Sequence, residues 1–220
     1  MFLIFDLETT GLPIFNTTGK YRFHSFRYLN KYDQSRIVSI SWILLDNSGK
    51  ITKQEYYIIR PLDFTIDNAS KATEINGITS EIAHERGVLW ETMYRAFLED
   101  VKKCHSLVAH NIQFDVSIML SEMFRYNKQQ GIEQFLAKKK LCTMKLGRLA
   151  MSQSRGPKLC DLYKHLYNEE MKNAHDASYD TLYCCKCFIS MMYLPDVQNL
   201  LIDVANNMTG ITGMTESNNC

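Results

Sequence analysis

The chain lacks any apolar run long enough to cross a membrane, because no stretch of its 220 residues approaches the roughly eighteen apolar residues required. An excess of charge of one sign is also absent, since 25 Lys and Arg stand against 24 Asp and Glu. With a formal net charge of +1, the chain is not a general binder of polyanions. We expect a soluble, intracellular protein of unknown compartment, because removal of a signal peptide would take away an acidic N-terminal phrase.

The cysteines do not form the regular framework of a zinc site or of a set of disulfides. The seven cysteines are an odd number at irregular spacing, and three of them share one predicted helix at 177–192. Such thiols are usually buried and reduced. We therefore expect neither structural zinc nor disulfides.

Hydrophobic residues make up 45% of the chain, which is enough to bury one full core without a second domain. We expect a single domain over residues 1–205, with an insertion at about 13–35, followed by a flexible polar tail over residues 206–220. Hydrophobic periodicity predicts strands near 1–8, 36–45, 51–59, 106–110 and 140–143, helices between about 68 and 103, and a closing helix at 177–192.

The residues that carry chemistry begin with Asp6 and Glu8, in the phrase FDLETTG. They end the apolar run MFLIF, which predicts a buried strand, so residues two apart share one face. Two carboxylates side by side at the end of such a strand repel each other unless a cation lies between them. Oxygen ligands without a neighbouring cysteine favour a hard ion, Mg2+ or Mn2+. A single acid at a strand end is usually only a solvated cap, so the interpretation requires partners elsewhere in the chain.

Two later phrases supply such partners. Asp115 ends the phrase HNIQFD, which follows a short predicted strand and opens a helix. His175 and Asp180 lie in HDASYD, where the helix at 177–192 begins. Their spacing puts His175 at the mouth of this helix and Asp180 over a turn inside it. The four acids and the histidine together predict a metal-dependent site that cleaves phosphodiester bonds.

In order and spacing, FDLETTG, HNIQFD and HDASYD resemble the three motifs of the DEDDh group of 3′-to-5′ exonucleases. This is the DnaQ-like family, which contains the proofreading subunit of bacterial DNA polymerase III and RNase T. The resemblance spans about residues 1 to 195. Each motif alone is unspecific, whereas three in the right order and with the right flanks are specific. His175 lies five residues before Asp180, which indicates the histidine branch of the group rather than the tyrosine branch.

The resemblance implies an α/β chain with the ribonuclease H-like fold. In this fold a central mixed five-stranded sheet, with a three-stranded antiparallel meander plus parallel strands, is flanked by helices. The resemblance also implies that two Mg2+ or Mn2+ ions are held by four acids: Asp6, Glu8, Asp115 and Asp180. His175 would be the general base of a two-metal hydrolysis, a role that requires a neutral imidazole. The products would be nucleoside 5′-monophosphates released from a 3′ end.

The same resemblance suggests which residues contact the terminal nucleotide of the substrate. These substrate-binding candidates are Thr10, Leu12, Ile78, Asn111 and Phe114. The first two follow the first motif, Ile78 lies in the phrase NGIT, and the last two flank the acid of the second motif. Ordinary core packing is the alternative for Ile78 and Phe114.

Basic residues are unevenly distributed along the chain. The stretch 138–158 contains no acid and the following basic residues: Lys138, Lys139, Lys140, Lys145, Arg148, Arg155 and Lys158. The insertion at 13–35 interleaves aromatic rings with cations, which is a common way to grip unpaired bases. We expect the basic stretch to line a phosphate path and the insertion to form one wall of a single-strand channel. A solvated surface is the ordinary alternative for both.

Three functions compete at this point. The first is a 3′–5′ exonuclease for single-stranded DNA or RNA ends, with DNA slightly favoured over RNA trimming of the oligoribonuclease type. The second is a catalytically silent nuclease-fold module that binds nucleic acid, which the five intact catalytic positions disfavour. The third is an unrelated phosphoesterase for small nucleotides. No polymerase partner is evident from the sequence, so free-standing action is expected, and formation of a homodimer is left open.

Overall fold

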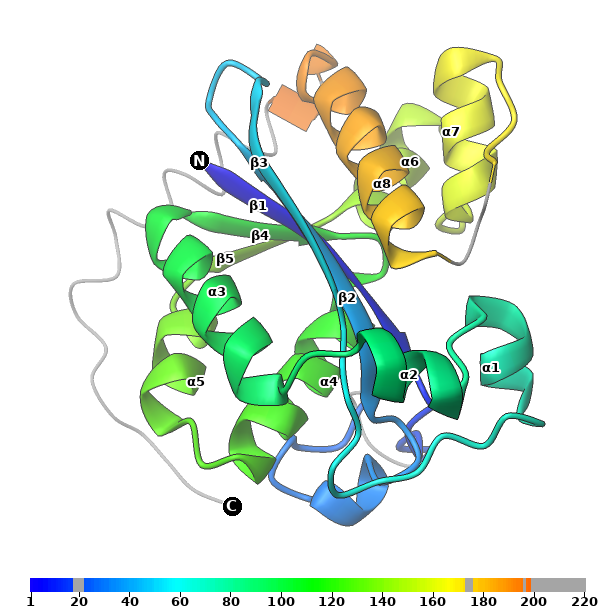
Figure 1. Ribbon diagram of the computed structural model, residues 1–220. Coiled ribbons are helices and arrows are strands. Elements are labelled where there is room, and N and C mark those ends of the chain that lie inside the picture. Colours follow the sequence, from blue (N-terminus) through cyan, green and yellow to red (C-terminus); the bar gives the residue numbers. More distant parts are fainter. Residues whose placement is uncertain (18–21, 173–175, 196, 199–220) are drawn as a thin grey trace.

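A computed structural model of the chain describes residues 1–17, 22–172, 176–195 and 197–198 and places five strands in one mixed sheet (Figure 1). The order across the sheet is β3 (Ile51–Ile58), β2 (Ile37–Leu45), β1 (Phe2–Thr9), β4 (Ser106–Ala109) and β5 (Lys139–Cys142). β1 and β3 run antiparallel to β2, whereas β1, β4 and β5 are parallel to one another. The predicted ribonuclease H-like α/β fold is confirmed.

β1 lies at the centre of the sheet, and its side chains alternate between the two faces. Leu3 and Phe5 are buried in a core on one face, and Ile4 is buried in a second core on the other. Because the side-chain period of a strand is two, Asp6 and Glu8 continue the face of Ile4. The strand thereby delivers two carboxylates to one face at its C-terminal end.

Helices cover both faces of the sheet (Figure 1). The face of Leu3 and Phe5 packs on α3 (Trp90–Lys103), α4 (Ile112–Arg125) and α5 (Gln129–Leu136). The face of Ile4 packs on α6 (Thr143–Ala150), α7 (Leu159–Tyr167) and α8 (Ala177–Met192). β2 is buried along its whole length, as expected for a strand covered on both sides. Within the described part of the chain, no helix combines the length and the apolar character that a bilayer crossing demands.

Short elements close the C-terminal end of β1. The helices α1 (Lys71–Asn76) and α2 (Ser80–Arg86) start at Ser70 and Thr79, whose hydroxyls accept hydrogen bonds from backbone N–H groups of the first turns. The predicted insertion contains one 3-10 turn, η1 (Leu29–Lys31). The predicted domain limits stay a prediction, and the tail at 206–220 lies outside the described residues.

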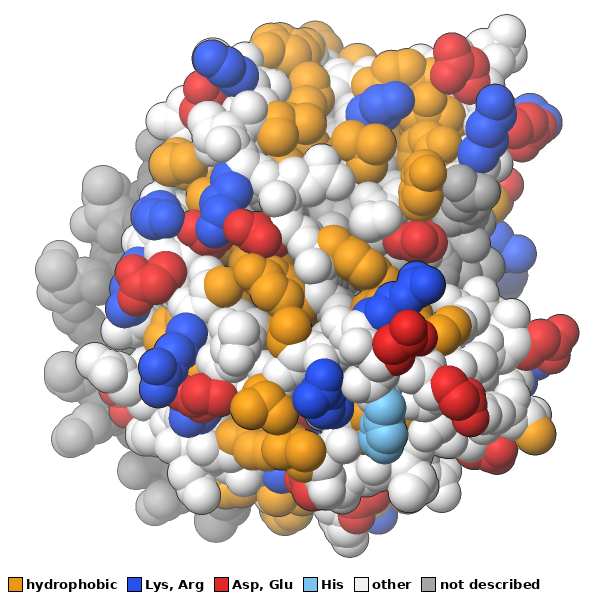
Figure 2. All heavy atoms as spheres, in the orientation of Figure 1, with side chains coloured by type: hydrophobic (Ala, Val, Ile, Leu, Met, Phe, Trp, Pro, Cys, Tyr) orange, Lys and Arg blue, Asp and Glu red, His pale blue; other side chains and the backbone are white. Residues whose placement is uncertain are grey.

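The described cysteines carry free thiols, and five of these six are buried: Cys104, Cys142, Cys184, Cys185 and Cys187. This agrees with the expectation of reduced, packed thiols. On the face shown in Figure 2, basic side chains are interspersed with acidic ones, which fits the small net charge of the chain. Affinity for a polyanion must therefore come from a local arrangement of charge rather than from the surface as a whole.

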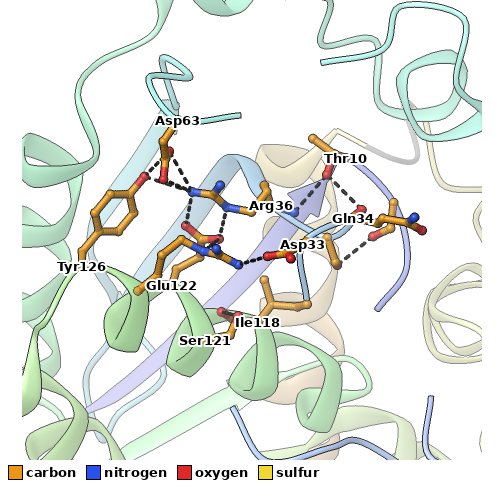
Figure 3. A network of polar contacts seen from close by, with 12 residues as sticks. Thr10, Asp33, Gln34, Arg36, Asp63, Ile118, Ser121, Glu122 and Tyr126 are labelled. Carbon is orange, nitrogen blue, oxygen red and sulfur yellow. Dashed lines mark hydrogen bonds and ion pairs between the residues drawn. The ribbon is translucent and has the colours of Figure 1, made fainter. Parts of the chain in front are cut away.

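A buried ion pair connects α4 to the segment that lies next to the C-terminal end of β1 (Figure 3). The Arg36 guanidinium is 4% exposed, and its Nε donates to Glu122 of α4, which is 2% exposed, at 2.5 Å. Its Nη2 donates to Asp63 at 3.0 Å and to the hydroxyl of Tyr126 at 3.0 Å. The backbone of Arg36 exchanges hydrogen bonds with Thr10, just beyond β1. One residue therefore fixes the position of α4 relative to the end of β1.

We expect Glu122→Ala to destabilise the fold by about 3–5 kcal/mol, because it leaves a buried guanidinium short of its closest counter-charge. The free energy of unfolding in urea measures the effect. Glu74→Ala is the matched control, since Glu74 pairs with Lys71 on the exposed surface and its loss should cost less than about 1 kcal/mol. Equal effects of the two substitutions would contradict a stabilising role for the buried pair.

Candidate active site

Three carboxylates meet beside the C-terminal end of β1. One oxygen each from Asp6, Glu8 and Asp180 lies within 4.8 Å of the other two. Asp6 and Glu8 come from one face of β1, and Asp180 comes from the first turn of α8, which packs on that face. Asp180, which lies 172 positions after Glu8 in the chain, thus joins the two acids of β1 in one anionic cluster, as the sequence motifs predict. We call these three residues the carboxylate cluster.

The start of α8 is fixed firmly over the sheet. Asp176 caps the helix by accepting hydrogen bonds from the backbone and hydroxyl of Ser178, at 2.9 and 2.6 Å. Thr181, which is fully buried, donates from its hydroxyl to the backbone carbonyl of Ser41 in β2 at 3.3 Å. Because Thr181 adjoins Asp180, this contact holds the Asp180 turn against the sheet.

Asp115 reaches the same region from the opposite helical layer. It lies in the first turn of α4 and is 2% exposed. Burial raises the pKa of Asp115 to about 8, against the opposing effect of hydrogen bonds from backbone groups that include Leu7 of β1. The charge of Asp115 in turn raises the pKa of Asp6, and the hydrogen bond from the Leu7 backbone places Asp115 beside the strand segment that carries Asp6 and Glu8.

The carboxylates destabilise one another when they are ionised. Burial raises the pKa of Asp6 well above its usual range, and the charges of Asp115, Glu8 and Asp180 raise it further. Burial, together with the charges of Asp180 and Asp115, raises the pKa of Glu8 to about 8. Such a site gains stability by binding positive charge. The donors are all carboxylate oxygens, so the cluster fits a hard divalent cation.

His175 lies outside the described residues, because the structure describes the chain up to 172 and again from 176. Its predicted role as general base therefore stays a prediction.

Comparison with known proteins agrees with this geometry. Residues 3–188 match the exonuclease family RNase T. The chain belongs to this exonuclease family. It thus carries a hydrolase domain of the DnaQ-like type, as the three motifs predict. A sequence search of curated proteins returns no match.

Several solved structures of exonucleases have the same fold as this chain, at low sequence identity. Exonuclease I of E. coli, solved with zinc and single-stranded DNA, has a TM-score of 0.70 at 17% identity over 96% of this chain and 44% of its own. Exonuclease I of Methylocaldum szegediense has a TM-score of 0.68 at 17% identity over 92% of this chain and 42% of its own. A 3′-exonuclease bound to a histone mRNA stem-loop has a TM-score of 0.64 at 12% identity over 89% of this chain and 64% of its own. The chain thus spans less than half the length of the exonuclease I proteins that it matches.

Thr10 and Leu12, which follow Glu8 in the sequence and are expected to contact the nucleotide, differ in their surroundings. Thr10 is held in place, because its hydroxyl donates to the backbone carbonyl of Gln34 at 3.0 Å and accepts from the backbone N–H of Arg36 at 2.9 Å (Figure 3). Leu12, by contrast, is 64% exposed.

The other expected contacts are more strongly packed. Ile78 is buried in a small apolar cluster with Val38. Asn111 adopts the left-handed conformation, φ 67°, immediately before α4. Phe114 is half-buried, and its ring lies edge-on to Phe23 of the insertion at a centroid distance of 6.4 Å. The insertion therefore lies against the helix that carries Asp115.

Two further residues shape the exonuclease site through contacts that only the structure shows. Gly11 is required where the chain turns after β1, because a Cβ there would lie 2.8 Å from the backbone carbonyl of Gln34. His110 donates from Nε2 to the backbone carbonyl of Pro157 at 3.0 Å, and its Nδ1 accepts from the hydroxyl of Thr143 at 3.0 Å. Burial lowers the pKa of His110 to about 4, so this imidazole is neutral and fixes the loop before α7. The glycine and the phrase HN were the available sequence signals.

Replacing one carboxylate should make the metal-free protein more stable and at the same time weaken its binding of a divalent ion. At a pH above the pKa of Glu8 and Asp115, the substitution Asp6→Asn removes one of the mutually repelling charges. It should therefore raise the melting temperature in EDTA, by about 2–4 °C for each kcal/mol of relieved repulsion. The same variant should lose the stabilisation that a saturating divalent ion gives wild type, about 2.7 kcal/mol at one hundred times Kd. Thermal unfolding with and without Mg2+ measures both effects. A variant that is less stable in EDTA, or that keeps the full Mg2+ response, would contradict this account of the carboxylate cluster.

Proposed function

We propose that the chain is a metal-dependent 3′–5′ exonuclease that hydrolyses phosphodiester bonds from the 3′ end of single-stranded nucleic acid and releases nucleoside 5′-monophosphates. The observation that carries the proposal is the carboxylate cluster of Asp6, Glu8 and Asp180, with Asp115 beside it. Membership of an exonuclease family supports the reaction class.

The cofactor we propose is a pair of Mg2+ or Mn2+ ions. Asp6, Glu8, Asp115 and Asp180 would hold them, because these four acids offer only oxygen donors and are mutually repulsive without a cation. When bound, such ions supply charge neutralisation and Lewis-acid stabilisation for phosphoryl transfer. The role of the protein is to hold four carboxylates in place so that little reorganisation is needed during the reaction.

His175 is the residue we propose as general base. It precedes the start of α8 by two positions in the sequence, and the first turn of that helix carries Asp180. A neutral imidazole would take a proton from the attacking water, a task suited to a group that titrates near neutrality. The spacing of His175 and Asp180 in the family motif supports this role.

For the substrate, we propose single-stranded DNA ahead of RNA. Exonuclease I has been solved with single-stranded DNA, which supports DNA, whereas the similar 3′-exonuclease is bound to a histone mRNA stem-loop, which keeps RNA trimming as the second candidate. The terminal nucleotide would contact a set of residues next to the carboxylates: Thr10, Leu12, Ile78, Asn111 and Phe114. We propose residues 1–205 as the limits of the exonuclease domain.

The test is the incubation of purified chain with 5′-labelled DNA and RNA oligonucleotides of the same sequence in Mg2+ or Mn2+. We expect a ladder of products that shortens from the 3′ end, with DNA cut faster than RNA. A product ladder that requires no metal, or cleavage inside the strand, would contradict the proposal. A chain that binds both oligonucleotides and cuts neither would instead be the silent binding module.

Two variants are the controls for this experiment. Asp180→Asn should abolish the ladder, since it removes one member of the carboxylate cluster. His175→Ala should lose most turnover yet keep the Mg2+-dependent rise in melting temperature, because it removes the proposed base and no metal ligand. Loss of the thermal response in His175→Ala would show that the histidine is structural.

A further inference from the structure

The basic stretch at 138–158 divides into two parts with different surroundings. Lys138 donates from Nζ to the backbone carbonyl of Cys104, beyond the end of α3, at 2.8 Å. Lys140 donates to the carbonyls of Phe135 and Leu136, at the end of α5, at 2.7 Å each. These ammonium groups satisfy helix C-termini. The expectation that the whole stretch lines a phosphate path is therefore wrong for Lys138 and Lys140.

The second part of the stretch is free to meet a ligand. Lys145 and Arg148 project from α6 and are exposed, and neither forms an ion pair with any acid in the described part of the chain. They line a hollow of about 340 Å3 together with Met144, Ser154 and Gly156. Other basic side chains of the sheet and helices, such as Lys53 and Arg95, are neutralised by neighbouring carboxylates. A hollow with two cations and no acid in its lining suits phosphate.

A larger hollow adjoins this one and includes one residue of the carboxylate cluster in its wall. The larger hollow measures about 470 Å3, and Asp180 is part of its wall. The two hollows share Met144 and Gly156 in their linings. Much of the remaining wall is apolar, with Pro157, Leu159 and Met171 among its residues. Its volume falls in the range of small-molecule sites, about 300–1,000 Å3, so a nucleoside fits within it.

The loop that contributes Gly156 to both hollows is held in place by two contacts. His110 fixes the carbonyl of Pro157, as described above. Gly156 lies so close to α6 that a Cβ at this position would be 2.4 Å from Cγ of Met144. The loop therefore keeps its place over α6, and the two adjacent hollows together line a surface that extends from Asp180 to Arg148. We call this surface the α6 path.

We propose that the α6 path binds the part of the single strand upstream of the cleaved bond. A nucleoside occupies the apolar hollow beside Asp180, and the phosphates on its 5′ side contact Lys145 and Arg148. This inference rests on the proposed exonuclease function and specifies its substrate as a strand of several nucleotides, rather than a dinucleotide or a nucleotide monoester. Upstream contacts make affinity depend on strand length, which a terminal-nucleotide pocket alone does not.

Binding in EDTA tests the α6 path without cleavage. Fluorescence anisotropy would compare labelled strands of about three and about twelve nucleotides on wild type and on the double variant Lys145→Gln with Arg148→Gln. We expect the variant to lose about tenfold in affinity for the long strand, so that the ratio between long and short strands shrinks. The slope of log affinity against log salt should fall by roughly 1.4, since two phosphate contacts on a single strand are lost.

The matched control is the double variant Arg95→Gln with Lys102→Gln, which also removes one arginine and one lysine charge. Both residues belong to α3, in the helical layer on the other side of the sheet. A loss of length-dependent affinity confined to the α6 variant supports the path. An equal loss in both double variants would mean that only net charge matters and would overturn the path, as would unchanged affinity in the α6 variant. Metal-dependent hydrolysis by wild type is measured separately, so failure of the proposed function and failure of the path give different results.

Discussion

Mutual repulsion among half-buried carboxylates at the end of β1 is the constraint on which the rest of the structure depends. Asp6 and Glu8 are forced onto one face by the period of the strand, and Asp180 is brought to within 4.8 Å of both. Burial and neighbouring charge raise the pKa of Asp6 and Glu8 together. The close approach of these carboxylates is unfavourable by itself, and contacts elsewhere in the fold hold it in place. It becomes favourable when positive charge is bound.

The scaffold supplies this constraint from both sides of the sheet. Thr181 holds the first turn of α8 to β2, next to Asp180. The buried pair of Arg36 and Glu122 holds α4, which carries Asp115, to the segment that enters β2. These contacts lie outside the chemistry, yet they set the separation of the acids. A wrong separation of a few tenths of an ångström would change which cation fits, since small ions demand tight geometry.

Much of this architecture was predictable from sequence because its signals are local. Apolar runs and the two-residue period predict β1 and the shared face of Asp6 and Glu8, and the spacing of HDASYD predicts Asp180 inside a helix. The pairing of Arg36 with Glu122 was not predictable, since it joins positions 86 residues apart with no local pattern. The basic stretch at 138–158 looked uniform in sequence. Only the fold separates Lys140, which contacts helix carbonyls, from Arg148, which borders an open hollow.

The central claim is that the carboxylates of Asp6, Glu8 and Asp180, with Asp115 beside them, form a cation site. The most direct measurement is a crystal structure of the wild-type chain grown or soaked in Mn2+, with anomalous differences recorded at the manganese edge. The account predicts an anomalous peak bounded by the oxygens of Asp6, Glu8 and Asp180, and its absence in crystals of Asp6→Asn. A structure without manganese at these residues, or with manganese bound only elsewhere, would contradict the account.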